Sequence, residues 1–120
     1  MSIDCELLLR WDATPEQQRA VGGALWGWCN RAAGDAGIYQ YLDNQALADL
    51  LAGRLPAPGP AARHAGLPYV YFEVRGDPAR DREATLESLR RALPAGGTTD
   101  VRVGGLSWRR EEGKGCPSQP

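Results

Sequence analysis

The side chains that could support catalysis or metal binding are few in this sequence and stand far apart. Its single histidine, His64, lies in a proline-rich stretch, with no serine or cysteine at a spacing typical of a nucleophile and its base. The cysteines Cys5, Cys29 and Cys116 are odd in number and form no CxxC motif, so they predict neither a disulfide framework nor a zinc site. We therefore expect His64 at the surface, and we predict no catalytic residue and no metal site.

Glycine pairs occur at three points, but none has the spacing or the following lysine of a phosphate-binding loop. These pairs are Gly22-Gly23, Gly96-Gly97 and Gly104-Gly105. Two acidic residues, Asp43 and Asp77, precede helical segments and are interpreted as helix caps. Nucleotide binding is not predicted, and we expect no cofactor. The lack of such motifs in the sequence favours a non-enzymatic protein but does not exclude catalysis.

The composition predicts one globular domain in a reducing compartment. Hydrophobic residues make up 42% of the 120 residues and charged residues 24%, which is ordinary for a folded domain. The net charge of -1 provides no general attraction to nucleic acid or to anionic membranes. No apolar run approaches the length of a membrane span, and the first residues lack the basic start of a signal peptide. We expect a cytoplasmic protein, and the abundance of alanine, glycine, arginine and proline suggests a GC-rich bacterial genome.

Residues 3–11 alternate between apolar and polar positions, which is the pattern of a half-buried strand. The positions on its inner side are Ile3, Cys5, Leu7, Leu9 and Trp11. Directly afterwards, residues 14–17 (TPEQ) combine a capping box with a proline at the first helical position. They predict a helix over residues 15–33.

The middle of the chain predicts two short elements and a loop. Residues 38–42 form a candidate strand, and residues 44–52 form a candidate helix that closes on a glycine. Residues 55–66 contain three prolines and two glycines, and they predict an irregular, exposed connection.

The second half of the chain repeats the strand and helix signals. Residues 69–75 (YVYFEVR) predict a clear strand, and residues 78–93 predict a helix that begins after an aspartate and a proline. Residues 100–108 predict a last strand, in which the two adjacent glycines indicate a bulge or a strand end. Residues 109–120 are charged and contain glycine and proline, so they predict a flexible tail.

With the helix at 44–52 taken as an insertion after the second strand, the order of elements is βαββαβ. This is the ferredoxin-like order, an α+β two-layer sandwich in which an antiparallel sheet carries two helices on one face. We therefore predict a single α+β domain over residues 1–108, followed by a flexible tail over residues 109–120. Such a fold leaves the second face of the sheet open, and we expect function there.

Four residues are the predicted partner-binding residues. On the strand at 69–75 the valines and the phenylalanine face the helices, so Tyr69 and Tyr71 point to the open face. Arg10 extends the same face from the first strand. On the first helix, Trp26 falls well off the apolar stripe, and tryptophan is enriched at interface hot spots. The alternative is that the face is solvated or self-associating and that Trp26 covers the segment at 38–53.

The segment LPYVYFEVRG, which contains Tyr69 and Tyr71, resembles the third-strand motif of RNA-recognition domains. The resemblance covers about ten residues and implies that the two tyrosines would stack on bases. Glu6 and Glu73 place negative charge on the same face, and together with the net charge of -1 they disfavour nucleic acid as a partner.

These features lead to two main hypotheses of function. The first is a small non-enzymatic protein-interaction module, of an accessory, inhibitor, immunity or regulatory type, that docks a partner through the open sheet face or the first helix. The alternative is a dimeric ferredoxin-like small-molecule binder or enzyme, with a pocket at the sheet face that uses Tyr69, Tyr71 or His64. An RNA-recognition-like binder is the least favoured. The expected partner is another protein or a second copy of the chain, and no membrane is involved.

Overall fold

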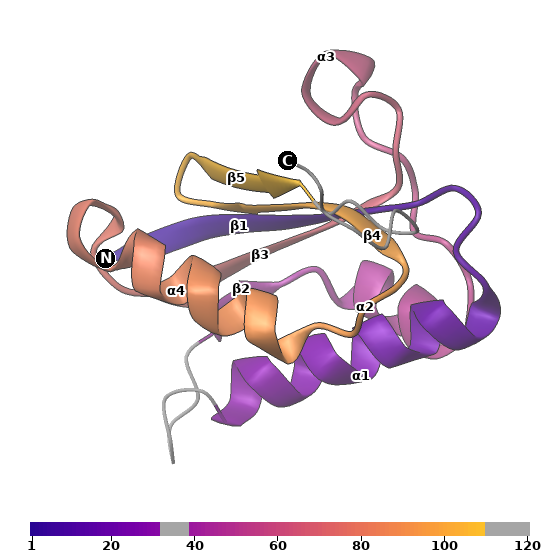
Figure 1. The fold of residues 1–120 in the computed structure, drawn as a ribbon, viewed down its shortest axis with the longest axis horizontal. Helices are drawn as coiled ribbons and strands as arrows, with labels where there is room; N and C mark the ends of the chain where they lie inside the picture. The colour runs from indigo at the N-terminus through magenta and orange to yellow at the C-terminus, as the bar shows by residue number, and fades with distance from the viewer. Residues whose placement is uncertain (32–38, 110–120) are drawn as a thin grey trace, which may run out of the picture.

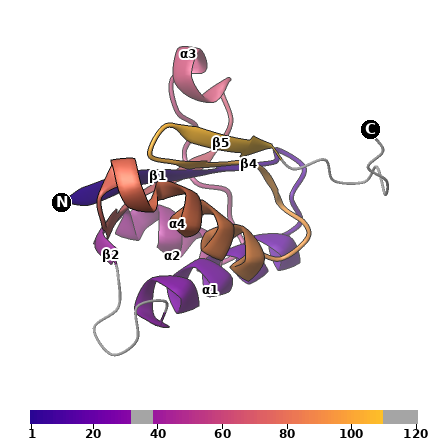
Figure 2. The ribbon, with the colours of Figure 1, turned by 60° about the vertical axis from the view of Figure 1, so that its left-hand side comes forward.

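A five-stranded antiparallel sheet forms the central layer of the computed structural model, which describes residues 1–31 and 39–109 (Figure 1). In these residues four helices accompany the sheet, so the fold is mixed α+β (Figure 2). The strands are β1 (Ser2–Leu9), β2 (Tyr39–Leu42), β3 (Tyr69–Arg75), β4 (Thr98–Val103) and β5 (Leu106–Arg109). The helices are α1 (Pro15–Arg31), α2 (Asn44–Leu51), α3 (Ala61–His64) and α4 (Pro78–Ala92).

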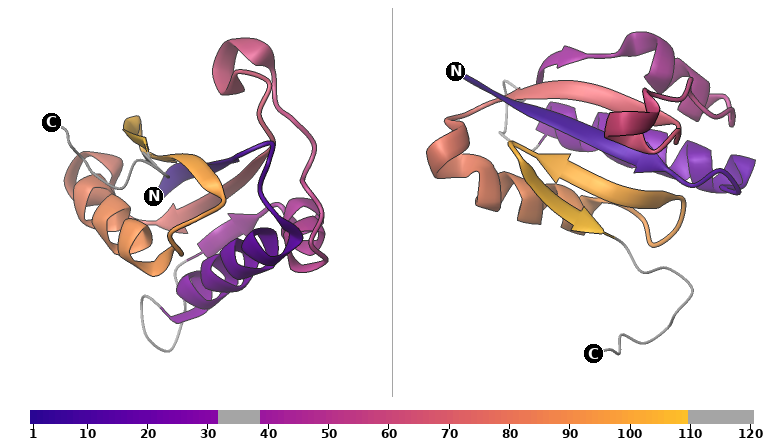
Figure 3. Two further views of the ribbon diagram at one scale, coloured as in Figure 1. Left: turned by 45° about the vertical axis from the view of Figure 1, so that its right-hand side comes forward. Right: turned by 90° about the horizontal axis from the view of Figure 1, so that it is seen from above.

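β1 lies in the middle of the sheet, whose strand order is β2-β3-β1-β4-β5 (Figure 3). It pairs in antiparallel fashion with β3 on one side and with β4 on the other. Alternate residues of β1 face the helices, with Ile3 opposite Val74 and Cys5 opposite Phe72. These four side chains are buried, so the apolar positions of the alternating pattern form the sheet side of the hydrophobic core.

The helices α1 and α4 cover one face of the sheet, and α2 packs beside α1 (Figure 2). Leu25 and Trp28 of α1 are part of the buried core. The indole Nε1 of Trp28 donates a hydrogen bond to Ser88 Oγ at 2.9 Å, which joins α1 to α4. A Cβ on Gly22 would lie 2.9 Å from the Cβ of Leu50, so this glycine allows α1 and α2 to pack closely.

Three helices begin at the capping residues that the sequence predicts. The Gln17 amide donates to Thr14 Oγ1 at 3.1 Å, and the Thr14 amide donates to Gln17 Oε1 at 3.0 Å, which completes the capping box. Asp77 accepts a hydrogen bond from an amide at the start of α4, and Asp43 does the same for α2. These helix starts therefore follow from contacts between neighbouring residues.

The structure refines one predicted strand and corrects another. Within residues 100–108 the sequence predicts a bulge or a strand end at Gly104-Gly105. The strand end is confirmed, because β4 ends at Val103, but the chain turns at the two glycines and returns as a separate strand, β5. Both glycines have positive φ angles, 56° and 90°, which suit a tight hairpin turn. The sequence also predicts Trp11 on the inner side of the first strand, but β1 ends at Leu9 and Trp11 is 57% exposed.

Residues 55–68, which we call the strap, lie over the sheet face that α1 and α4 leave open (Figure 1). Their backbone is held by hydrogen bonds from Leu9 N to Pro68 O at 2.8 Å and from Gly59 N to Leu67 O at 3.1 Å. The prediction of an exposed connection is wrong for the inner side of the strap. Its residue His64 is 1% exposed, as is Leu8, whose side of β1 faces away from the helices.

No helix within residues 1–31 and 39–109 is long and apolar enough to cross a membrane. Some predictions lie outside the described residues: the last two positions of the first helix, residue 38 of the second strand, and residues 110–120 of the tail with Cys116.

Candidate functional site

The candidate site lies on the sheet face opposite α1 and α4, beside the strap. β1 contributes Asp4 and Glu6, β3 contributes Tyr71, β4 contributes Arg102, and the strap contributes Arg63. Together with the turn between β4 and β5, they line a groove of about 480 Å³. Strand residues alternate between faces, so these polar side chains share one face while their apolar neighbours pack in the core.

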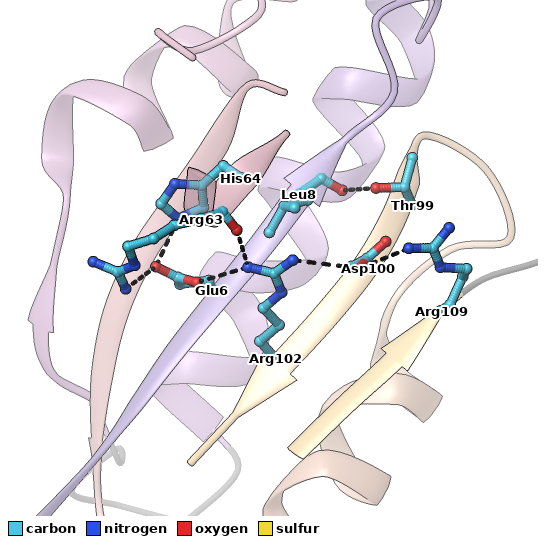
Figure 4. A network of polar contacts seen from close by, with 8 residues as sticks. All are labelled: Glu6, Leu8, Arg63, His64, Thr99, Asp100, Arg102 and Arg109. Atoms are coloured by element: carbon cyan, nitrogen blue, oxygen red, sulfur yellow. Dashed lines mark hydrogen bonds and ion pairs between the residues drawn. The ribbon is translucent and has the colours of Figure 1, made fainter. Parts of the chain in front are cut away.

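Glu6 is the centre of a polar network on this face (Figure 4). Its Oε2 atom is 2.9 Å from His64 Nε2 and 3.3 Å from Arg63 Nη2. Its Oε1 atom is 3.7 Å from Arg102 Nη1. Because Glu6 is only 8% exposed, its carboxylate depends on these donors to replace the water that it has lost.

Arg102 extends the network to the strap backbone and across β4. Its Nη1 atom donates a hydrogen bond to the Arg63 carbonyl oxygen at 2.6 Å. Its Nη2 atom lies 3.7 Å from Asp100 Oδ2, and Arg109 of β5 lies 3.8 Å from the same oxygen. The strap is thus held to the sheet through one of its carbonyl groups as well as through its side chains.

The imidazole of His64 is enclosed between the sheet and the strap. Its ring stacks on Tyr69, with 4.1 Å between centroids and 19° between planes. Because the Glu6 carboxylate can only accept, His64 Nε2 carries a proton. In the described part of the chain His64 Nδ1 has no hydrogen-bond partner, and a Cβ on Gly59 would lie 2.2 Å from it. The prediction of a surface histidine is therefore wrong, and the strap backbone leaves no room for a substrate at this nitrogen.

The Tyr71 hydroxyl lies between two carboxylates at the other end of the groove. It is 2.5 Å from Glu73 Oε2 and 3.1 Å from Asp4 Oδ1. Desolvation, followed by the hydrogen bonds to Glu73 and Asp4, raises the pKa of Tyr71 well above its ordinary value. The hydroxyl therefore stays protonated, and the two carboxylates share its single proton.

Exposed aromatic side chains gather on both sides of the edge strand β2. Tyr39 lies 5.9 Å from Trp26 of α1, and Tyr41 lies 5.8 Å from Tyr71 of β3, measured between ring centroids. A register shift between the two β2 tyrosines places Tyr39 opposite a helix-facing residue of β3 and Tyr41 opposite an outward-facing one. Trp26, Tyr39 and Tyr41 are 42%, 37% and 51% exposed. We call Trp26, Tyr39, Tyr41 and Tyr71 the aromatic edge.

The four residues predicted to bind a partner occupy three places. Trp26 and Tyr71 belong to the aromatic edge, on opposite faces of the sheet. Tyr69 is stacked against the histidine of the strap. Arg10 lies beyond the end of β1 and donates to Asp12 through hydrogen bonds of 2.8 and 3.0 Å, which lower the pKa of that carboxyl group.

Reasoning from the sequence missed Tyr39 and Tyr41 as surface residues of interest. Simple alternation along β2 would put both on one face, and the register shift that separates them has no clear sequence signal. The available signal was composition, since two of the four residues in this strand are tyrosines. Glu6 and His64 were also not linked, because 58 positions separate them in the chain.

The two buried cysteines take no part in this site. Cys5 and Cys29 are free thiols with 0% exposure. Desolvation raises the pKa of Cys29 to about 12 and also raises the pKa of Cys5, so both thiols are protonated and poor nucleophiles. Within residues 1–31 and 39–109, no three His, Cys, Asp or Glu side chains are grouped so that they could hold a metal ion.

Comparison with known proteins found no matching family model, no matching curated protein and no matching solved structure. Support for a function therefore comes from the geometry of this chain.

Proposed function

We propose that this chain is a non-enzymatic protein-interaction domain, of the accessory, inhibitor or regulatory type, that docks a partner protein on the aromatic edge. The observation that carries the proposal is the register shift in β2, which leaves an aromatic pair on each face of one sheet edge. Tyrosine and tryptophan are enriched at interface hot spots because their rings bury a large apolar area with few rotatable bonds. A partner that straddles this edge contacts aromatic rings on both faces.

The shape of β2 favours docking through side chains over the addition of a partner strand. In the described part of the chain β2 spans four residues, and its pairing with β3 is interrupted by the register shift. Short and irregular edge strands are poor templates for pairing with another strand. The rings of the aromatic edge are therefore the groups through which a partner would bind.

The enclosed histidine supports a non-catalytic role. His64 Nε2 is engaged by Glu6, and His64 Nδ1 faces the backbone at Gly59. A general base needs a nitrogen within hydrogen-bond reach of a substrate proton. The contacts of His64 fit a residue that holds the strap on the sheet.

We also propose that the fold is a ferredoxin-like βαββαβ unit with three additions, α2 and α3 after the second strand and β5 after the fourth. In support of this, β1 pairs with both β3 and β4, β2 pairs with β3, and all pairs are antiparallel. β5 pairs only with the outer side of β4. We further propose a cytoplasmic location, because the two buried cysteines are free thiols, as expected in a reducing compartment.

Photo-crosslinking in the native host tests the docking proposal. A photoreactive phenylalanine analogue at the Tyr41 position should capture the partner, whereas the same group at Trp11 should not. Trp11 is the matched control because its exposed fraction is similar to that of Tyr41. It follows the last residue of β1, whereas Tyr41 lies near the start of that strand.

Alanine substitutions then measure the contribution of the aromatic edge. Trp26→Ala and Tyr41→Ala should each lower recovery of the partner by about tenfold, as for hot-spot residues, and Trp11→Ala should leave it unchanged. Recovery that is the same for all three variants and the wild type would refute the proposal.

A second candidate function, a dimeric small-molecule binder, is favoured by one observation, the groove on the sheet face. Its volume of about 480 Å³ suits a small ligand, and polar groups from four strands line it. Light scattering and a thermal-shift screen of metabolites test this candidate. A monomer that no metabolite stabilises would remove it.

A further inference from the structure

Two carboxylates stand close together beside the aromatic edge. Asp4 and Glu73 are directly opposite each other in the β1–β3 pair, and both lie within hydrogen-bond distance of the Tyr71 hydroxyl. The ion pairs among residues 1–31 and 39–109 include neither carboxylate, and the two arginines that line the groove are engaged by Glu6. Like charges opposite each other on neighbouring strands destabilise a sheet, so the two carboxylates repel each other across the Tyr71 hydroxyl.

An angled pair of aromatic rings adjoins these carboxylates. The rings of Tyr41 and Tyr71 are 5.8 Å apart with 48° between their planes, and about half of Tyr41 is exposed. The face of an aromatic ring attracts cations, and a guanidinium group can stack on a ring while its N–H groups donate to a carboxylate. The rings and the carboxylates therefore offer complementary contacts to the same kind of group.

We infer that this half of the aromatic edge binds an arginine or lysine side chain of the partner protein. The cation site consists of Asp4, Tyr41, Tyr71 and Glu73. The inference rests on the proposed function and specifies the partner's chemistry, a basic segment. The groove that begins at Asp4 leaves space for the residues that flank the bound side chain.

The charges that line the groove favour a basic over an acidic segment. Arg63 and Arg102 line the far part of the groove, but both compensate the buried carboxylate of Glu6. An anionic ligand would compete with Glu6 for them. A cation at Asp4 and Glu73 would instead relieve the repulsion between two carboxylates and displace no existing ion pair of the described residues.

The test uses two synthetic peptides, acetyl-Gly-Ser-Arg-Ser-Gly-amide and the same peptide with citrulline in place of arginine. Citrulline keeps the shape of arginine and removes its charge. Each peptide is titrated into the ¹⁵N-labelled full chain, and binding is followed by amide chemical shifts. We expect the arginine peptide to bind about fivefold or more tightly than the citrulline peptide, with the shift changes centred on Tyr41 and Tyr71.

A charge-neutral variant assigns this preference to the two carboxylates. Asp4→Asn with Glu73→Gln keeps acceptors for the Tyr71 hydroxyl and removes the repulsion, so the fold should be retained, as judged by the amide spectrum. The variant should lose most of the preference for the arginine peptide, because only the aromatic rings of the cation site remain. The control variant, Glu16→Gln with Glu83→Gln, removes the same charge from exposed helix positions and should keep the preference for arginine.

Three results would overturn the inference: no shift with the arginine peptide, equal binding of both peptides to the wild type, or a neutral variant that keeps the preference. Capture of the partner in the host distinguishes failure of the cation site from failure of the proposed function. If Trp26→Ala abolishes capture and the Asp4/Glu73 variant does not, docking stands and the cation site fails. If Trp26→Ala and Tyr41→Ala leave capture intact, the proposed function itself fails.

Discussion

Replacing His64 with alanine should destabilise the protein strongly because two contacts of a buried ring are lost together. The imidazole stacks on Tyr69 at 4.1 Å and donates from Nε2 to Glu6 Oε2 at 2.9 Å. A hydrogen bond to a charged group contributes about 1.5–3 kcal/mol, and an aromatic contact adds roughly 0.5–1.5 kcal/mol. The free energy of unfolding should therefore fall by about 2–4.5 kcal/mol.

Two further substitutions separate these contributions. In His64→Phe the ring can still stack on Tyr69 but cannot donate to Glu6, so the loss should be about 1.5–3 kcal/mol. Arg63→Ala is the control on the same strap. Its side chain is 70% exposed and its ion pair with Glu6 is screened by water, so its effect should stay within about 1 kcal/mol.

Urea unfolding followed by tryptophan fluorescence measures the free energies, and hydrogen exchange at Leu9 reports on the strap itself. The Leu9 amide donates to Pro68 O at 2.8 Å, so it should exchange faster when the strap lifts. If His64→Ala unfolds within about 0.5 kcal/mol of the wild type and Leu9 exchanges at the same rate, His64 does not hold the strap.

Other parts of the structure make three further predictions. Gly59→Ala would place a Cβ 2.2 Å from His64 Nδ1, so it should lower the free energy of unfolding by about 1–3 kcal/mol in the same urea assay. The control Gly23→Ala has open space around it on α1 and should be neutral or stabilising by up to about 1 kcal/mol. Equal effects of the two substitutions would contradict the close contact at Gly59. In a Cys116→Ser variant the two remaining thiols are buried with raised pKa values, so dithionitrobenzoate should label neither before unfolding and both afterwards; early labelling would show that a thiol is accessible. Hydrogen bonds from the two arginines that follow on α4 lower the pKa of Glu87, so its contribution to stability is present above the ordinary carboxyl pKa of 4.5 and is lost as the pH falls through the lowered value. Glu87→Gln should therefore flatten the acid side of a thermal-unfolding profile, and an unchanged profile would show that these hydrogen bonds do not stabilise the fold.

The helix starts could be predicted from the sequence because their causes are local. The partners of the capping box, Thr14 and Gln17, are three positions apart, and Asp77 contacts an amide two positions later. The apolar alternation of β1 and β3 is also visible in the sequence, because burial on one face imposes a period of two. These signals need no knowledge of how distant segments meet.

The errors occur where distant segments decide the outcome. His64 has no local reason to be buried, and its partner Glu6 is 58 positions away. Trp11 continues an alternating pattern, but β1 ends at Leu9. Beyond that residue the alternation no longer determines which side of the sheet a side chain is on. The positions of Tyr39 and Tyr41 depend on how β2 is paired with β3, which a single strand does not encode.

Because of the strap, β1 is covered on both faces at one of its ends and on one face at the other. At Leu8 the strand has helices on one side and the strap on the other, whereas at Asp4 one face of the strand is open to water. Local opening of β1 therefore disturbs two packed surfaces at the Leu8 end of the strand and only one at the Asp4 end. We therefore expect backbone amides of the sheet to exchange more slowly at the end held by His64 than at the end that carries the aromatic edge.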